Sequence, residues 1–189
     1  MNKIVRNALV VFWLLPLGLV SGCSPPSDKS ASTSRRQEAR QEQVIAGRAS
    51  VIDGDTLEIH GHRIRLQAID APEARQTCKL DGKPWPCGRQ AAFALADLIG
   101  TRPVECRSRQ RDRWDRAVAV CRVGETEINA WMVEHGWALA YRRYGKDYLG
   151  QEKAARAERR GVWAGSFVPP WEHRRGREKE VSAGSFAST

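Results

Sequence analysis

Hydrophobic and polar residues alternate along the first part of the folded chain. The stretches QVIAGRASVID and TLEIHGHRIRLQAI carry this period of two, with many β-branched residues and a turn at His60-Gly61. Alternation of this kind is typical of strands that bury one face. We therefore expect either three strands or one long bent strand followed by two.

The periodicity then becomes helical. Residues 88–100, GRQAAFALADLIG, place Ala92, Leu95, Ala96 and Ile99 on one face and end at a glycine. This spacing predicts a helix whose apolar face packs on the strands.

The second half of the chain repeats both patterns. VECRSRQ and RAVAVCRV predict two strands around the turn RDRWDR, and INAWMVEHG and DYLGQEKAARAERRG predict two further helices. Three strands, a helix and two strands is the element order of an OB-fold barrel. The predicted fold class is α+β, mainly β: a five-stranded OB barrel with three helices. An unspecific α+β domain is the alternative.

The N-terminus has the pattern of an export signal. Lys3 and Arg6 precede an apolar run over 8–19, which is short for a membrane span and typical of a signal peptide. VSGC at 20–23 resembles a bacterial lipobox, which implies cleavage before Cys23 and lipidation of that residue. An ordinary signal peptide with an incidental cysteine is the alternative.

Composition divides the rest of the chain. Residues 23–42 are rich in Ser, Pro, Gln and Arg, and predict a disordered tether after the leader at 1–22. Residues 173–189 predict a disordered basic tail, so the folded domain is expected at 43–172.

The chain is basic, with 31 Lys and Arg against 22 Asp and Glu, a net charge of +9. The leader removes only two positive charges, so the mature chain keeps +7. A basic excess favours polyanionic partners, either nucleic acid or an anionic membrane.

Lipidation of one of the five cysteines would leave an even number in an oxidising compartment. In the predicted hairpin, Asp112 opposes Asp115, and the same register opposes Cys106 to Cys121. Cys78 and Cys87 would then close the small loop between them. A metal site is disfavoured, because these last two cysteines lack CxxC spacing and have no nearby histidine.

Five carboxylates crowd residues 51–73: Asp53, Asp55, Glu58, Asp70 and Glu73. Turns near Gly54 and Pro72 can bring all of them except Glu58 to one mouth of the sheet, where they would repel each other. Hard oxygen ligands favour Ca²⁺ or Mg²⁺. Arg63 and Arg65 share a face of the intervening strand, and an arginine beside a metal suits phosphate chemistry. Two polar turns with a surface ion pair are the alternative.

The stretches DGDT, IRLQAIDAPE, DRWDRAVAV, NAWMVEHGWALAYRRY and ERRGVW together resemble the staphylococcal nuclease (thermonuclease) family over about residues 45–163. The resemblance implies a five-stranded OB barrel with three helices. It also implies Ca²⁺-dependent cleavage of DNA and RNA to products that end in 3′-phosphate.

The resemblance also assigns roles to single residues. Metal ligands would be the carboxylates of Asp55 and Asp70 and the backbone carbonyl of Ala71, with Asp53 supporting the site. Glu73 would activate or orient the attacking water, and Arg65 and Arg116 would grip the phosphate. The residues implied in nucleic-acid binding are Arg113, Trp114, Tyr141, Arg142 and Tyr144. Asp115 departs from the family pattern, and its charge beside Arg116 would weaken phosphate binding.

The sequence thus predicts an exported, lipid-anchored, Ca²⁺-dependent nuclease that acts as a monomer on DNA, RNA or both. The alternative is a catalytically silent OB-fold module that binds nucleic acid or serves envelope or polysaccharide assembly. Ser24 follows Cys23 where an aspartate resembles an inner-membrane retention signal, so the outer membrane is the expected location. Simple secretion is the alternative.

Overall fold

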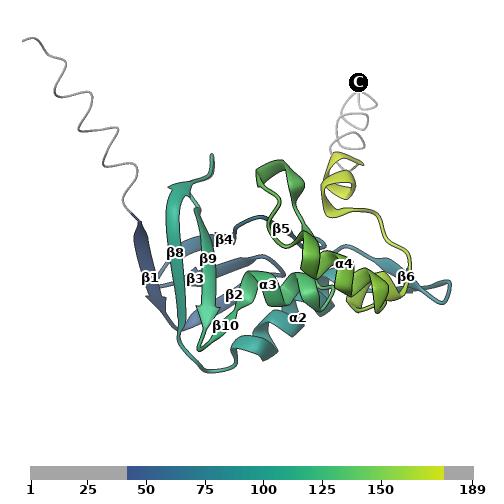
Figure 1. The fold of residues 1–189 in the computed structure, drawn as a ribbon, viewed down its shortest axis with the longest axis horizontal. Coiled ribbons are helices and arrows are strands. Elements are labelled where there is room, and N and C mark those ends of the chain that lie inside the picture. Colours follow the sequence, from purple (N-terminus) through teal and green to yellow (C-terminus); the bar gives the residue numbers. More distant parts are fainter. Residues whose placement is uncertain (1–41, 177–189) are drawn as a thin grey trace, which may run out of the picture.

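The structure, a computed structural model, describes residues 42–176 (Figure 1). Several predicted segments lie outside the described residues: the leader, the predicted lipidation site Cys23, nearly all of the tether and most of the basic tail. Within the described part of the chain, no helix is both long and apolar enough to cross a membrane.

One sheet dominates the fold, and its strands are ordered β1-β8-β9-β4-β3-β2, with β10 added beside β9. Its members are β1 (Gln43–Gly47), β2 (Ala49–Asp53), β3 (Thr56–Ile59), β4 (His62–Leu66), β8 (Val104–Arg111), β9 (Ala117–Val123) and β10 (Thr126–Glu127). Only Arg48 separates β1 from β2, yet these two strands form opposite ends of the order. The sheet therefore curls around one bent strand, as in an OB barrel. The predicted mainly-β α+β class is confirmed, and so is the bent first strand.

All strand pairs in this sheet are antiparallel except one. β4 runs parallel to β9, with Arg65 opposite Val118. This pairing brings the arginine of the first half of the chain beside the strand that leaves the β8–β9 turn.

Four helices are present in the described residues, where the sequence predicted three. They are α2 (Cys87–Ile99), α3 (Ile128–Glu134), α4 (Leu149–Ala157) and a helical segment at 170–176. Two short 3₁₀ helices, η1 (Arg142–Tyr144) and η2 (Gly161–Ala164), lie beside α4 in the chain. The fourth helix extends beyond the predicted domain boundary at 172. Nothing in the sequence indicated this helix, because Trp171 is its one large apolar residue and the remainder of the segment is mostly polar.

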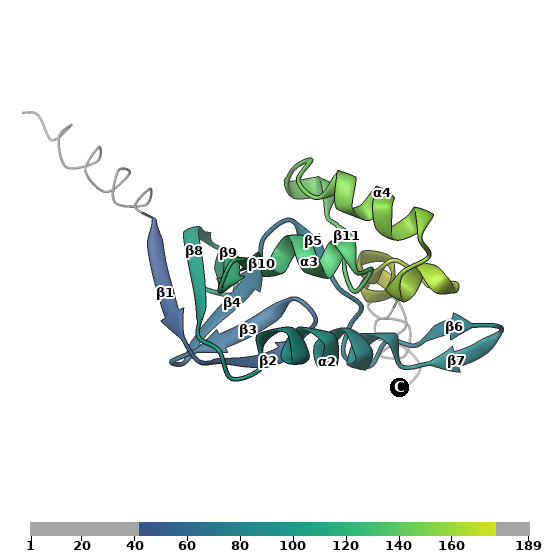
Figure 2. The ribbon, with the colours of Figure 1, turned by 60° about the horizontal axis from the view of Figure 1, so that its bottom comes forward.

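Two small strand pairs complete the fold. β5 (Ile69–Asp70) pairs with β11 (Leu139–Ala140), and β6 (Cys78–Leu80) pairs with β7 (Lys83–Trp85). Figure 2 shows the β6–β7 hairpin extending beyond the end of the molecule where α2 begins.

The core lies between the inner face of the sheet and the helices. The buried face of α2 carries Ala91, Leu95 and Ile99. Of the predicted face, Ala92 is only partly buried and Ala96 is exposed. The helix is therefore rotated slightly from the expected orientation, because the small Ala91 packs against the turn at Gly54.

Both predicted disulfides are formed, Cys78–Cys87 and Cys106–Cys121. The second joins directly opposed residues of β8 and β9. The turn differs from the prediction: the Asp112 N–H donates to the Arg116 carbonyl, and an irregularity between Ser108 and Gln110 restores the register of the cysteines.

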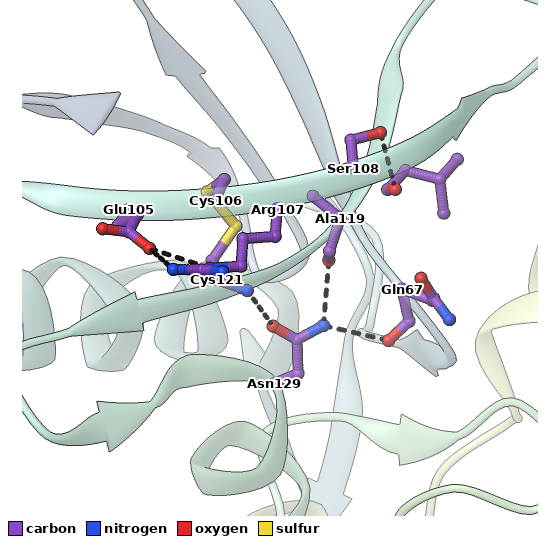
Figure 3. Close-up of a disulfide and its surroundings, with 9 residues drawn as sticks. Gln67, Glu105, Cys106, Arg107, Ser108, Ala119, Cys121 and Asn129 are labelled. Atoms are coloured by element: carbon purple, nitrogen blue, oxygen red, sulfur yellow. Dashed lines mark hydrogen bonds and ion pairs between the residues drawn. A yellow bond between two sulfur atoms is a disulfide. The ribbon is translucent and has the colours of Figure 1, made fainter. Parts of the chain in front are cut away.

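A buried asparagine links this disulfide to the turn before β5 (Figure 3). Asn129 Oδ1 accepts from the Cys121 N–H at 3.0 Å. Its Nδ2 donates to the carbonyls of Gln67 at 3.0 Å and Ala119 at 3.2 Å. The first turn of α3 thus fixes the chain that leads into Asp70.

Candidate active site

The turn after β2 places Asp55 inside the molecule. The Ala71 N–H donates to Asp55 Oδ2 at 2.7 Å, and the Thr56 hydroxyl donates to Oδ1 at 3.2 Å. A Cβ on Gly54 would lie 2.7 Å from the Cβ of Ala71 and 2.9 Å from that of Ala91. Glycine is therefore required here for the acidic turn to approach the 71 loop.

Arg65 on β4 lies between two carboxylates. Its guanidinium forms an ion pair with Asp55 and donates to Asp70 Oδ1 at 2.7 Å and to the Ile69 carbonyl at 3.2 Å. Asp70 ends β5 and is fully buried. Burial lowers the pKa of Arg65, and the charges of Asp70 and Asp53 oppose this decrease.

Asp53 lies at the edge of the same cluster. Its Oδ1 accepts from the Asp55 N–H at 3.0 Å, so it shapes the turn that presents Asp55. Burial raises the pKa of Asp53, and its hydrogen bond with Thr56 and the charges of Arg65 and Arg116 act in the opposite direction. Arg116 therefore lies within electrostatic range of the barrel site.

A third arginine, missed by sequence reasoning, reaches the carboxylates from the C-terminal helix. Arg174 donates to both oxygens of Asp70, at 3.1 and 2.8 Å, and to Glu73 Oε1 at 2.7 Å. Burial would lower the pKa of Arg174, but the hydrogen bonds to Asp70 and Glu73 outweigh it and raise the pKa. The residue was assigned to the basic tail, where nothing in the sequence distinguishes it from Arg175.

Glu73 is also held through its backbone. Its N–H donates to Gln76 Oε1 at 3.2 Å, while Gln76 Nε2 donates to the Val168 carbonyl at 2.7 Å. Gln76 is 1% exposed. A Cβ on Gly88 would lie 1.7 Å from the Glu73 carbonyl oxygen, so the start of α2 supports this loop closely.

Arg116 occupies a different setting, in the turn of the β8–β9 hairpin. Its Nε donates to Asp112 Oδ2 at 2.7 Å, and Asp112 Oδ1 accepts from the backbone N–H groups of Trp114 and Arg116. Burial would raise the pKa of Asp112, but these bonds outweigh it and lower the pKa. Asp115, which precedes Arg116 in the chain, forms an ion pair with Arg111 at 3.3 Å.

The predicted nucleic-acid contacts fall in two places. Trp114 is 63% exposed at the hairpin tip, with the Arg113 guanidinium 4.0 Å from its ring centroid. Tyr141 stacks on Trp171 at 5.7 Å, and Arg142 pairs with the buried Glu152 at 3.2 Å. Tyr144 belongs to η1. A cavity of about 540 Å³ lies between η1 and α4. Its lining residues are Arg142, Gly145, Lys146, Leu149, Glu152, Lys153 and Arg156.

The described residues contain no group of three or more His, Cys, Asp or Glu side chains arranged to hold a metal ion. Asp55 and Asp70 nevertheless converge, because both contact the guanidinium of Arg65. The backbone of Ala71 is adjacent to both. This donor set consists of hard oxygens and carries two negative charges, so it fits a cation such as Ca²⁺ or Mg²⁺.

The fold and site define an OB-like α+β protein with carboxylates and arginines gathered at one edge of the barrel. Residues 63–165 match the family described as Staphylococcal nuclease homologue. The chain belongs to this family.

The relatives of this chain include proteins named as nucleases and one named for succinoglycan biosynthesis. The succinoglycan biosynthesis protein ExoI of Rhizobium meliloti is 40% identical, over 67% of this chain and 68% of its own length. The micrococcal nuclease of Shigella flexneri is 36% identical, over 66% of this chain and 77% of its own. An uncharacterized endonuclease of Haemophilus influenzae is 33% identical, over 60% of this chain and 63% of its own.

Proposed function

We propose that this protein is a Ca²⁺-dependent nuclease that hydrolyses phosphodiester bonds of DNA, RNA or both and leaves 3′-phosphate products. Membership of the family and the nuclease names of relatives support hydrolysis of nucleic acid. The observation that carries the proposal is the position of Arg65 between Asp55 and Asp70, with Glu73 joined to Asp70 through a shared arginine.

Each residue has a role that its setting supports. Asp55, Asp70 and the Ala71 carbonyl would hold the cation, which supplies positive charge to the phosphate oxygens. Glu73 accepts or orients the proton of the attacking water. Arg65 and Arg116 stabilise the charge that grows on the phosphate in the transition state.

Substrate binding is assigned to the two basic regions beside the barrel edge. Trp114 is exposed enough to stack on a base, and Arg113 beside it is placed to contact the backbone. Four cations and one acid line the cavity next to Tyr141, which suits a neighbouring phosphodiester. Contact with backbone and base faces fits a substrate bound without strict sequence preference.

The place of action is proposed from the sequence. Lipid at Cys23 would hold the monomeric domain at the outer membrane, and secretion without lipid is the alternative. Fractionation and determination of the mature N-terminus test this. A soluble protein that starts at another residue would contradict anchoring.

The resemblance to a protein named for succinoglycan biosynthesis favours one second candidate, a silent module in polysaccharide assembly. Digestion of single- and double-stranded DNA and RNA with Ca²⁺, with Mg²⁺ and with chelator separates the two. We expect cleavage with Ca²⁺ and its loss with chelator. Cleavage that is equal in excess chelator contradicts the metal dependence, and absence of cleavage under all conditions favours the silent module.

A further inference from the structure

The C-terminal segment at 166–176 is fastened to the site at several points. Ser166 and Lys79 exchange two backbone hydrogen bonds of 2.8 Å. Gln76 holds the Val168 carbonyl, and Trp171 stacks on Tyr141. These contacts position Arg174 beside the carboxylates of Asp70 and Glu73. The family match ends at residue 165, so the whole segment lies beyond it.

Arg174 engages the carboxylate that a metal would need. Both oxygens of Asp70 accept from it, and one of them also accepts from Arg65. Its side chain is 35% exposed, so its charge is reachable from solvent although its partner Asp70 is fully buried. The bidentate pair with Asp70 is a strong, directional contact.

A divalent cation and Arg174 cannot both use Asp70 in this arrangement without placing like charges in contact. Asp55, Asp70 and Glu73 carry three negative charges and already pair directly with the guanidiniums of Arg65 and Arg174, while Asp53 adds a fourth acid at the edge of the cluster. Adding two further positive charges beside both guanidiniums would produce strong repulsion at partly buried positions. Arg174 is the one that can leave, because its side chain is 35% exposed on a helix outside the barrel, whereas the side chain of Arg65 is 16% exposed and belongs to β4.

We infer that Arg174 is a displaceable internal cation: the C-terminal helix closes over Asp70 and Glu73, and a divalent metal must displace it to bind. The competition between Arg174 and the metal would regulate the site of the proposed nuclease. Its effect on cleavage therefore rests on the proposed function, whereas its effect on metal binding can be measured without nuclease activity. The helix thereby sets the metal concentration at which the site becomes loaded.

Calorimetric titration of the full chain with Ca²⁺ tests the competition. If the helix is closed over the site about nine-tenths of the time, removing the contact of Arg174 with Asp70 and Glu73 should tighten the apparent affinity for Ca²⁺ about tenfold. Arg174→Ala should show this tightening. Arg175→Ala removes the same charge from the same helix at an exposed position, and its affinity should match that of the unchanged chain.

Hydrogen exchange of peptides covering 166–176 gives a second readout that needs no activity. Saturating Ca²⁺ should increase exchange near Arg174 in the unchanged chain. Arg174→Ala should exchange quickly there even without Ca²⁺, and Arg175→Ala should behave like the unchanged chain.

Three results would overturn the inference. They are equal or weaker Ca²⁺ affinity in Arg174→Ala, exchange at 166–176 that bound Ca²⁺ leaves unchanged, and the same tightening in Arg175→Ala. Failure of the nuclease proposal is distinguishable: a chain that binds Ca²⁺ more tightly after Arg174→Ala but cleaves nothing keeps the displaceable cation and loses the nuclease. A chain that binds no Ca²⁺ in either form loses both.

Discussion

The edge of the barrel and the tip of the β8–β9 hairpin hold their arginines in opposite ways. Arg65 is 16% exposed and bonded to two buried carboxylates from different segments. Arg116 is 24% exposed and forms an ion pair with Asp112 of its own turn. The guanidinium of Arg65 therefore stabilises the fold as well as the site, whereas loss of the guanidinium of Arg116 would disturb only its own turn. Two arginines with the same proposed role in catalysis can therefore differ widely in how much they stabilise the fold.

The largest expected effects come from removing either arginine. Arg65→Ala and Arg116→Ala should each lower kcat about a thousandfold or more, since the proposed role of each is to stabilise transition-state charge. Without metal, Arg65→Ala should also lower the free energy of unfolding by about 3 kcal/mol, because buried Asp55 loses its ion pair and buried Asp70 keeps only its pair with Arg174. Arg116→Ala should lower it by less than about 1 kcal/mol. Cleavage rates and urea unfolding measure both.

Arg63→Ala is the matched control, because Arg63 lies on the same strand but is exposed. It should change neither rate nor stability appreciably. Equal stability losses in Arg65→Ala and Arg116→Ala would contradict the comparison.

A smaller effect should follow from loosening the hairpin arginine. Asp112→Asn keeps an acceptor for the turn but loses the charged bond to Arg116 Nε, so kcat should fall about tenfold to a hundredfold through misorientation. Because the pKa of Asp112 lies below its ordinary value of 3.8, its charge stabilises the fold fully above that pH. The stability difference between the unchanged chain and Asp112→Asn should shrink as pH falls through the lowered pKa. A difference that grows on acidification would show that the ion pair is misassigned.

Removing the exposed aromatic should affect binding and spare the fold. Trp114→Ala should weaken binding of single-stranded substrate about tenfold by loss of base stacking, with little change in unfolding free energy. Phe93→Ala on α2 removes another exposed ring and serves as control. Titration with a fluorescent oligonucleotide measures the difference, and equal losses in both variants would refute a stacking role.

The smallest effect is expected at Asp115. Its φ of 62° is left-handed, so Asp115→Gly should relieve backbone strain and raise stability by up to about 1 kcal/mol. Substrate affinity should change less than about threefold, because the ion pair of Asp115 is with Arg111. A large gain in affinity would restore the idea that Asp115 opposes phosphate binding at Arg116.

Periodicity and local spacing were sufficient to predict most of the barrel and both disulfides. The bent first strand, α2 and the opposed Cys106 and Cys121 all follow from patterns within neighbouring segments. The acidic cluster with Arg65 was also accessible, because turns at fixed positions return the chain to the same edge of the sheet.

Contacts between distant segments could not be predicted in this way. Arg174 bonds to residues about a hundred positions earlier, and Asn129 links α3 to Gln67. Neither residue has a local signal: one is an arginine in a basic stretch, the other a polar residue in a short helix. The ion pair between Asp115 and Arg111 also had no signal in the sequence, because it depends on the geometry of the β8–β9 turn.

Among the attachments of the C-terminal segment, the hydrogen bond from Gln76 and the ion pairs of Arg174 respond differently to salt and pH. The amide of Gln76 carries no charge, so its hold on Val168 is indifferent to dissolved salt and to pH, whereas the contacts of Arg174 weaken as ions accumulate. At high salt concentration the helix that carries Arg174 would detach from Asp70, while the backbone at Val168 stays bound to Gln76. The segment is therefore expected to stay attached at Val168 and to open at Arg174 as the ion concentration rises.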